Sequence, residues 1–352
     1  MYDINRRTDR CNRNSNIELL RIIAMFLIVA HHYVVNSGLM DVILDNPTSG
    51  NSVFMLIYGM FGKTCINCFV LITGYFMCKS NITVRKFVKL LAEIMFYRIV
   101  IYLIFICTGY QSFSPINLLI IIIPVTSIQQ NFTGCFLIFW LTIPFLNILI
   151  GNIDERMHLF LLALCGFTYI ILGTVHRVSM NYVTWFIVLY FIASFIRMYD
   201  IELFSRGKMW GRVCIISILL SITSIFACLQ VGFAPYTFVS DSNTFLAVTI
   251  GLSAFLFFKN LKIQNSKIIN TIASSTFGVL LIHASGDTMR KWLWKDLFNN
   301  VEAYNNSNSI VHALTSTIII FIVCVIIDQI RINLLEKPFM KWIDKRLLER
   351  KL

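Results

Sequence analysis

Long apolar blocks, separated by short polar segments, constrain the fold of this chain more than any other feature. Each block is close to the roughly 20 residues that a helix needs to cross a bilayer. In a soluble protein, apolar residues would instead recur in stripes along amphipathic elements. The sequence therefore predicts an all-α, polytopic membrane helix bundle with about ten transmembrane helices. The expected spans are 17–37, 53–78, 87–109, 132–151, 157–174, 182–198, 212–232, 243–259, 270–285 and 309–334.

The composition indicates that the excess apolar surface faces lipid. Only 14% of the 352 residues are charged, whereas a soluble domain of this length carries roughly a quarter. The formal net charge of +12 could suggest a nucleic-acid partner, but the charges lie between the apolar blocks, where basic residues usually fix topology. The expected partner of this surface is therefore the lipid bilayer, and no nucleic acid is expected.

Segments rich in Lys and Arg alternate with segments that contain none. The basic ones include both chain ends, 79–89, 197–212 and 259–267, whereas 38–52 and 110–131 contain no Lys or Arg. Because basic loops are retained in the cytoplasm, both termini are predicted to be cytoplasmic, which requires an even number of spans.

The chain is expected to form one membrane domain over 1–352. A basic N-terminal segment, 1–16, precedes the bundle at 17–334, and a basic tail, 335–352, follows it. The short apolar piece 116–125 lies between two prolines and is interpreted as a half-helix or interfacial segment.

One predicted outer loop, 286–308, fits the charge pattern poorly. It contains Arg290, Lys291 and Lys295. Its two tryptophans, Trp292 and Trp294, suggest a segment that lies at the membrane interface.

Most of the ten cysteines lie inside apolar blocks and are expected to pack as small apolar residues. Cys65 and Cys68 form a CxxC, but no second pair follows at metal-ligand spacing. No metal site is therefore predicted.

The first span contains the most informative polar residues. Arg21 and His32 are eleven residues apart, so they share one helix face about 16 Å apart along the axis. His31 lies beside His32 on another face. The alternatives are that Arg21 is an interfacial anchor paired with Glu18, and that His32 is a packed, hydrogen-bonded histidine. Two histidines in a span nevertheless favour proton transfer, because imidazole titrates near neutral pH.

Further ionisable or polar residues occur at mid to outer depth on other spans. Lys63 and Asn67 share a face of the second span, Arg98 lies past the middle of the third, and His283 ends the ninth. Such residues are costly in a membrane, so each one is a candidate for function. We expect Lys63, Arg98 and His283 to line one polar cavity with His32; the alternative is several unrelated buried contacts.

Several segments, taken in order, resemble the bacterial acyltransferase family 3 membrane proteins. Arg21 and His32 match its Arg-x10-His motif, although Thr73 replaces a serine and Ile101 interrupts the Arg-x-x-Arg pair that would begin at Arg98. The other matching segments are GKTCINCFVLITGYF (62–76), PFLNILI (144–150), WFIVLYFIASFIR (185–197), SNTFLAVTIGLSAFLFFKNLKI (242–263), IASSTFGVLLIH (272–283) and LLEKPFMKWI (334–343).

The resemblance implies an O-acyltransferase in the bacterial cytoplasmic membrane. The acyl donor would be acetyl-CoA or a similar acyl-CoA, used as a co-substrate with no resident cofactor. The acceptor would be a hydroxyl of a surface polysaccharide or lipid-linked glycan. His32 would be the general base, Arg21 a donor-side or structural residue, and Arg98 a further catalytic candidate. Lys63, Asn67, His31 and His283 are expected to contact substrate.

Two other classes of function use the same features. A glycan transporter or flippase could use the polar cavity without chemistry, although such proteins tend to have inverted repeats and interrupted helices. A membrane-embedded regulator of polysaccharide synthesis is the third possibility, with no sequence feature that favours it directly.

Overall fold

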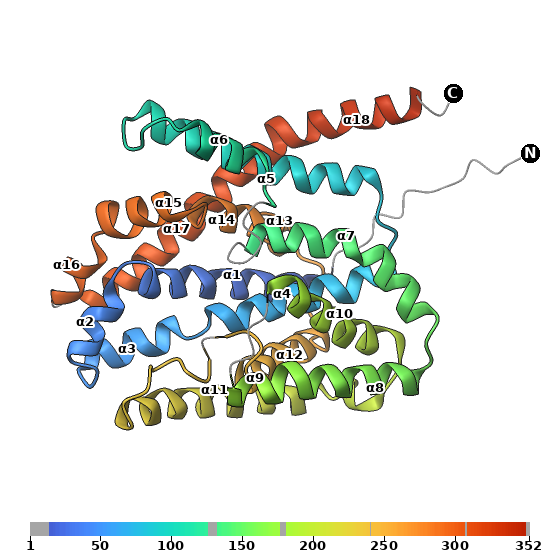
Figure 1. Cartoon of the computed structure of the whole chain (residues 1–352), viewed down its shortest axis with the longest axis horizontal. Coiled ribbons are helices and arrows are strands. Elements are labelled where there is room, and N and C mark those ends of the chain that lie inside the picture. The colour runs from blue at the N-terminus through green and yellow to red at the C-terminus, as the bar shows by residue number, and fades with distance from the viewer. Residues whose placement is uncertain (1–13, 126–131, 177–180, 240, 307, 350–352) are drawn as a thin grey trace, which may run out of the picture.

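The computed structural model describes residues 14–125, 132–176, 181–239, 241–306 and 308–349. These residues form helices and no strand (Figure 1). The elements in chain order are α1 Ser15–Val35, α2 Leu39–Asp45, α3 Gly50–Gly59, α4 Gly62–Met77, α5 Val84–Cys107, α6 Pro115–Ile122, α7 Phe132–Gly151, α8 Glu155–Cys165, η1 Gly166–Ile171, α9 Leu172–His176, α10 Tyr182–Met198, η2 Glu202–Ser205, α11 Gly207–Gln230, α12 Phe245–Lys259, α13 Lys267–Ser274, α14 Thr276–His283, α15 Asp287–Lys291, η3 Trp292–Leu297, α16 Asn300–Asn305, α17 Ser309–Arg331, η4 Ile332–Glu336 and α18 Lys337–Glu349.

Seven stretches of the described residues are long and apolar enough to cross a membrane. They are Ser15–Val35, Gly50–Met77, Val84–Cys107, Phe132–Gly151, Glu155–His176, Gly207–Gln230 and Ser309–Arg346. The prediction of an all-α, multi-pass membrane bundle is therefore confirmed. Two further predicted spans correspond to the shorter apolar helices α10 and α12, and one to the bent pair described below, so the number ten remains a prediction.

Side-chain caps set the start of several helices. The side chains of Asn14, Thr83, Asp154 and Asn181 each accept a hydrogen bond from a backbone N–H in the first turn that follows. These caps satisfy groups that have no partner within the helix, so the polar breaks between the apolar blocks define where helices begin.

Helix α1 lies near the centre of the bundle, where it packs against α3, α4, α12, α13 and α17 (Figure 1). Helix α4 packs in turn against α10 and α12, and α11 covers α12. Outer helices expose large apolar side chains, for example Ile148, Phe160 and Leu219. This distribution is that of a bundle whose polar residues are collected inside and whose apolar residues face lipid.

The described terminal elements lie at the same end of the bundle. In Figure 1 the start of α1 and all of α18 lie toward the right, while α2 and α16 lie at the opposite end. The compartment that each end faces remains a prediction, and the N-terminal arginines lie outside the described residues.

The segment that follows α14 turns sharply. The helices Lys267–His283 and Asp287–Leu297 meet at 91°. Trp294 was expected at the membrane interface but is fully buried, with its ring 5.8 Å from that of Tyr33. It therefore anchors the turned segment to α1.

The short helix α6 has no buried residue, which is compatible with the interpretation as a half-helix or interfacial segment.

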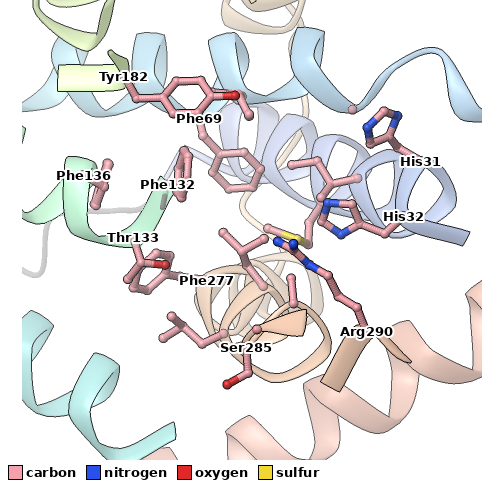
Figure 2. Close-up of a pocket in the computed structure, with 18 of the residues that line it drawn as sticks. His31, His32, Phe69, Phe132, Thr133, Phe136, Tyr182, Phe277, Ser285 and Arg290 are labelled. Atoms are coloured by element: carbon pink, nitrogen blue, oxygen red, sulfur yellow. The ribbon is translucent and has the colours of Figure 1, made fainter. Parts of the chain in front are cut away.

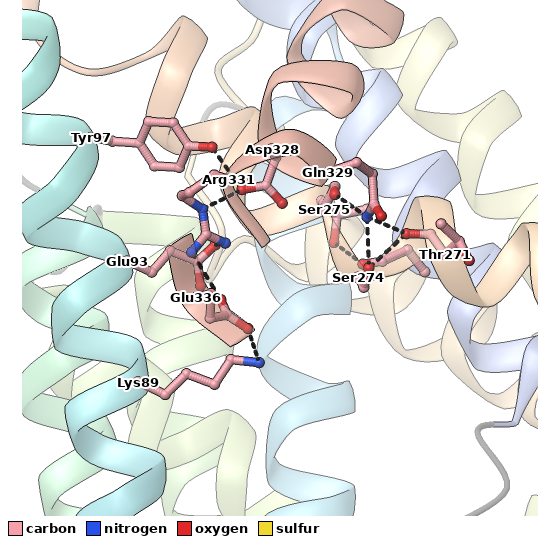
Figure 3. Close-up of polar contacts among 12 residues, drawn as sticks. Lys89, Glu93, Tyr97, Thr271, Ser274, Ser275, Asp328, Gln329, Arg331 and Glu336 are labelled. Carbon is pink, nitrogen blue, oxygen red and sulfur yellow. Dashed lines mark hydrogen bonds and ion pairs between the residues drawn. The ribbon is translucent and has the colours of Figure 1, made fainter. Parts of the chain in front are cut away.

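A buried charge network fastens α5 to α17 (Figure 3). Arg331 donates hydrogen bonds to three carboxylates: Asp328 at 2.8 Å, Glu336 at 2.8 Å and Glu93 at 3.0 Å. Lys89 pairs with Glu336 at 2.7 Å. An unpaired charge in the interior of a membrane bundle is very costly, so this network holds α5 and α17 in one register.

Candidate active site

A cavity of about 410 Å³ opens inside the bundle between α1, α4, α5, α7 and α14. Figure 2 shows His31, His32 and Arg290 on one side and the rings of Phe69, Phe132, Phe136 and Tyr182 across from them. The remaining polar lining includes Lys63, Arg98, Asp287, Thr73, Thr133 and Ser285. The cavity therefore joins a cationic, histidine-containing wall to an aromatic one.

A hydrogen bond to His283 orients His32. The His283 Nδ1 atom lies 2.6 Å from the Val279 carbonyl oxygen, which can only accept, so Nδ1 carries a proton and donates it. In neutral His283 the other nitrogen, Nε2, is then an acceptor. His32 Nδ1 lies 2.9 Å from that Nε2 and must donate to it. The lone pair of His32 is thereby placed on Nε2, the atom that a general base uses.

His31 has a similar arrangement on the adjacent face. Its Nδ1–H donates to the Gly59 carbonyl at 2.5 Å. A Cβ at Gly62 would lie 2.2 Å from the His31 ring, so only glycine at this position lets the ring lie against α4. His31 and His32 have ring centroids 5.7 Å apart, and both line the cavity.

Lys63 enters the cavity from the start of α4. Its ammonium donates to the Tyr182 hydroxyl at 2.5 Å and lies 5.2 Å from the centre of the Tyr182 ring. Both residues line the cavity. The pair places a positive charge and a hydroxyl in the same cavity as the histidines, where they can stabilise an oxyanion.

Arg98 reaches the cavity from α5. Its guanidinium donates to the Ile120 carbonyl at 2.9 Å, near the end of α6. Arg98 also lines a neighbouring cavity beneath α6, which extends along Ile101 and Asn117. The Arg98 guanidinium therefore lies at the boundary between the histidine cavity and the cavity beneath α6.

Arg290 is a cavity residue that sequence reasoning did not select. It lies in α15, pairs with Asp287 at 3.1 Å and lines the cavity with His32. Its Nε atom is buried and has no hydrogen-bond partner among the described residues. The sequence feature that could have indicated Arg290 is the basic character of the predicted outer loop, which the alternation of basic and non-basic loops does not explain.

Three residues predicted for the site do not line the cavity. His283 contacts His32 through the hydrogen bond described above but is not part of the cavity lining. Asn67 is fully buried: it donates to the Ser242 carbonyl at 2.7 Å and accepts from Trp185 Nε1 at 2.9 Å. Asn67 therefore joins α4 to α10 and to the segment before α12. It was expected to contact substrate, but its side chain does not line the cavity.

Arg21 is the third. Its guanidinium lies 3.8 Å from Glu18, the partner that the interpretation as an anchor requires. Along α1 it is about 16 Å from His32. The described residues contain no group of three His, Cys, Asp or Glu side chains that could hold a metal ion.

The fold and the cavity define a class of protein: a multi-pass membrane protein with a buried, histidine-containing polar site. Comparison with known families is more specific. A family model described as an acyltransferase domain matches residues 14–329, and the chain therefore belongs to acyltransferase family 3, as the sequence resemblance predicted. No curated protein and no solved structure gives a significant match. Family and fold together fit a membrane acyltransferase.

Proposed function

We propose that the protein transfers an acetyl or similar acyl group from acyl-CoA to a hydroxyl of an extracytoplasmic or lipid-linked cell-surface polysaccharide in bacteria. The observation that carries this proposal is the hydrogen bond from His32 to His283. It leaves the Nε2 lone pair of His32 available within a cavity that also holds cations. A proton acceptor beside positive charges is the arrangement that acyl transfer to a hydroxyl needs.

The reaction follows from this arrangement. His32 Nε2 takes the proton of the acceptor hydroxyl while that oxygen attacks the thioester carbonyl carbon. The negative charge that develops on the carbonyl oxygen faces Lys63 and Arg290. When the tetrahedral intermediate collapses, the carbon–sulfur bond breaks and the thiolate of coenzyme A takes the proton back from His32. The acceptor leaves as an ester, and the histidine is regenerated.

The other residues have supporting roles in this proposal. His283 is a positioning residue, because it acts on the substrate only through His32. His31 and Arg98 are close enough to the cavity to contact either substrate. Arg21, on the donor side of α1, orders the end of the helix at which basic loops would attract the phosphates of acyl-CoA.

The test uses purified protein with radiolabelled acetyl-CoA and membranes that contain surface glycan. Label is expected to enter glycan with the wild-type protein. His32→Ala is expected to abolish transfer while the protein still inserts into the membrane and remains folded. Undiminished transfer by this variant would refute the role of His32.

One observation favours the transporter alternative. The 91° bend between α14 and α15 interrupts an apolar helix beside the cavity, and interrupted helices are common in transporters. The same labelling experiment separates the two functions. A flippase would move labelled glycan across vesicle membranes without acetyl-CoA, and it would leave the acetyl label on coenzyme A.

A further inference from the structure

A second cavity of about 590 Å³ adjoins the histidine cavity. We call it the vestibule. It shares Asp287 and Arg290 with the histidine cavity, so the two spaces meet at one wall. The residues that line the vestibule are Asn36, Tyr110, Gln111, Asp287, Thr288, Arg290, Lys291 and Lys295. All of them carry a polar group, in contrast to the aromatic wall of the inner cavity.

The vestibule collects positive charge at the end of the bundle where such charge is scarce. Among the described residues of the loops at this end, Lys and Arg occur only as Arg290, Lys291 and Lys295. A topology signal cannot explain them, because basic residues belong on the opposite side. Three cations on two short consecutive elements, α15 and η3, therefore call for another explanation.

The acidic neighbours neutralise these cations only in part. Asp287 pairs with Arg290, but its side chain is 98% exposed and well hydrated. Asp296 lies 3.9 Å from Lys291 and accepts a hydrogen bond from Tyr110. Lys295 makes no ion pair with any residue that the structure describes. The vestibule thus retains an excess of positive charge and spare hydrogen-bond donors.

The uncharged lining suits a carbohydrate. The amides of Asn36 and Gln111 offer both donors and acceptors, and the Lys291 ammonium lies 5.5 Å from the centre of the Tyr110 ring. Ammonium and guanidinium groups bind carboxylates and phosphates through charge-assisted hydrogen bonds. A sugar that carries an anionic group would satisfy both kinds of lining at once.

We propose that the vestibule binds an anionic group, a carboxylate or a phosphate, carried by the glycan acceptor. Binding there would present a neighbouring hydroxyl to His32 past Arg290. This inference rests on the proposed function and adds the chemical class of its acceptor. It predicts that acceptors are uronic-acid-containing or phosphate-linked sugars rather than neutral ones.

The test measures equilibrium binding to the full-length protein in detergent by calorimetry. The probes are glucuronic acid, glucose 1-phosphate and glucose. The variants are Lys291→Gln/Lys295→Gln and the charge-retaining Lys291→Arg/Lys295→Arg. At least one anionic sugar is expected to bind about tenfold more tightly than glucose, and to lose about tenfold in the glutamine variant but little in the arginine variant. The anion that binds distinguishes a carboxylate polymer from a phosphate-linked sugar.

Three results would overturn the inference. The anionic sugars could bind no better than glucose, or bind the glutamine variant as tightly as the wild type. Coenzyme A could instead displace the sugar and lose affinity with the two lysines, which would make the vestibule a donor site. Transfer that requires His32 alongside any of these results would refute the vestibule alone. Lysine-dependent binding of an anionic sugar without any acyl transfer would refute the proposed function alone.

Discussion

The contact between His32 and His283 provides the sharpest test of the site. In His283→Phe the ring volume is largely kept, but the acceptor for the His32 Nδ1–H is lost. The bond is 2.9 Å long and His283 is 1% exposed, so water does not readily replace the missing partner. A buried donor left without a partner costs about 1–3 kcal/mol. The His32 ring can then lower its energy by turning or by moving its proton to Nε2, which removes the base.

The expected effect is a fall in kcat by a factor of roughly 5 to 150, since about 1.4 kcal/mol corresponds to tenfold. The KM for acetyl-CoA should change little, because His283 does not line the cavity. The assay is acetyl transfer from labelled acetyl-CoA at several donor concentrations, with purified protein in detergent.

His158→Phe is the matched control. His158 is also fully buried, and its Nε2 lies 3.1 Å from the Phe191 carbonyl; neither residue lines the cavity. It should lose stability without a change in kcat. A wild-type kcat in His283→Phe would refute the reasoning, as would an equal loss of kcat in both variants.

Two further predictions concern the packing of His31 against α4 and the charge network that joins α5 to α17. Gly62→Ala should push the His31 ring off α4, lowering kcat at least fivefold and stability by about 1–3 kcal/mol, as measured by transfer and thermal-unfolding assays. Gly166→Ala, whose Cβ meets open space, should leave kcat unchanged and should not lower stability, because Ala favours a helix more than Gly does. Arg331→Met should lower stability by about 3–5 kcal/mol, because the buried carboxylates of Glu93 and Asp328 lose their shared cationic partner. A wild-type unfolding temperature would show that the network is dispensable.

The membrane fold could be predicted from the sequence by itself. Blocks of about 20 apolar residues predict membrane-spanning helices, because a helix satisfies its own backbone hydrogen bonds in lipid, where no water can do so. The same logic selects the rare ionisable residues inside the blocks. His32, Lys63 and Arg98 were found in this way, and all three line one cavity. Their chemical roles remain proposals.

Only the tertiary structure decided which of these residues meet. Helical periodicity assigns a residue to a face but does not say which helix that face contacts. Asn67 shares a face with Lys63, yet it is satisfied by Trp185 away from the cavity. Arg290 lies in a segment that the sequence predicts to be an outer loop, and it enters the site because the chain bends by 91° after α14. The pairing of His32 with His283 spans 251 residues, so it depends on the packing of α1 against α14.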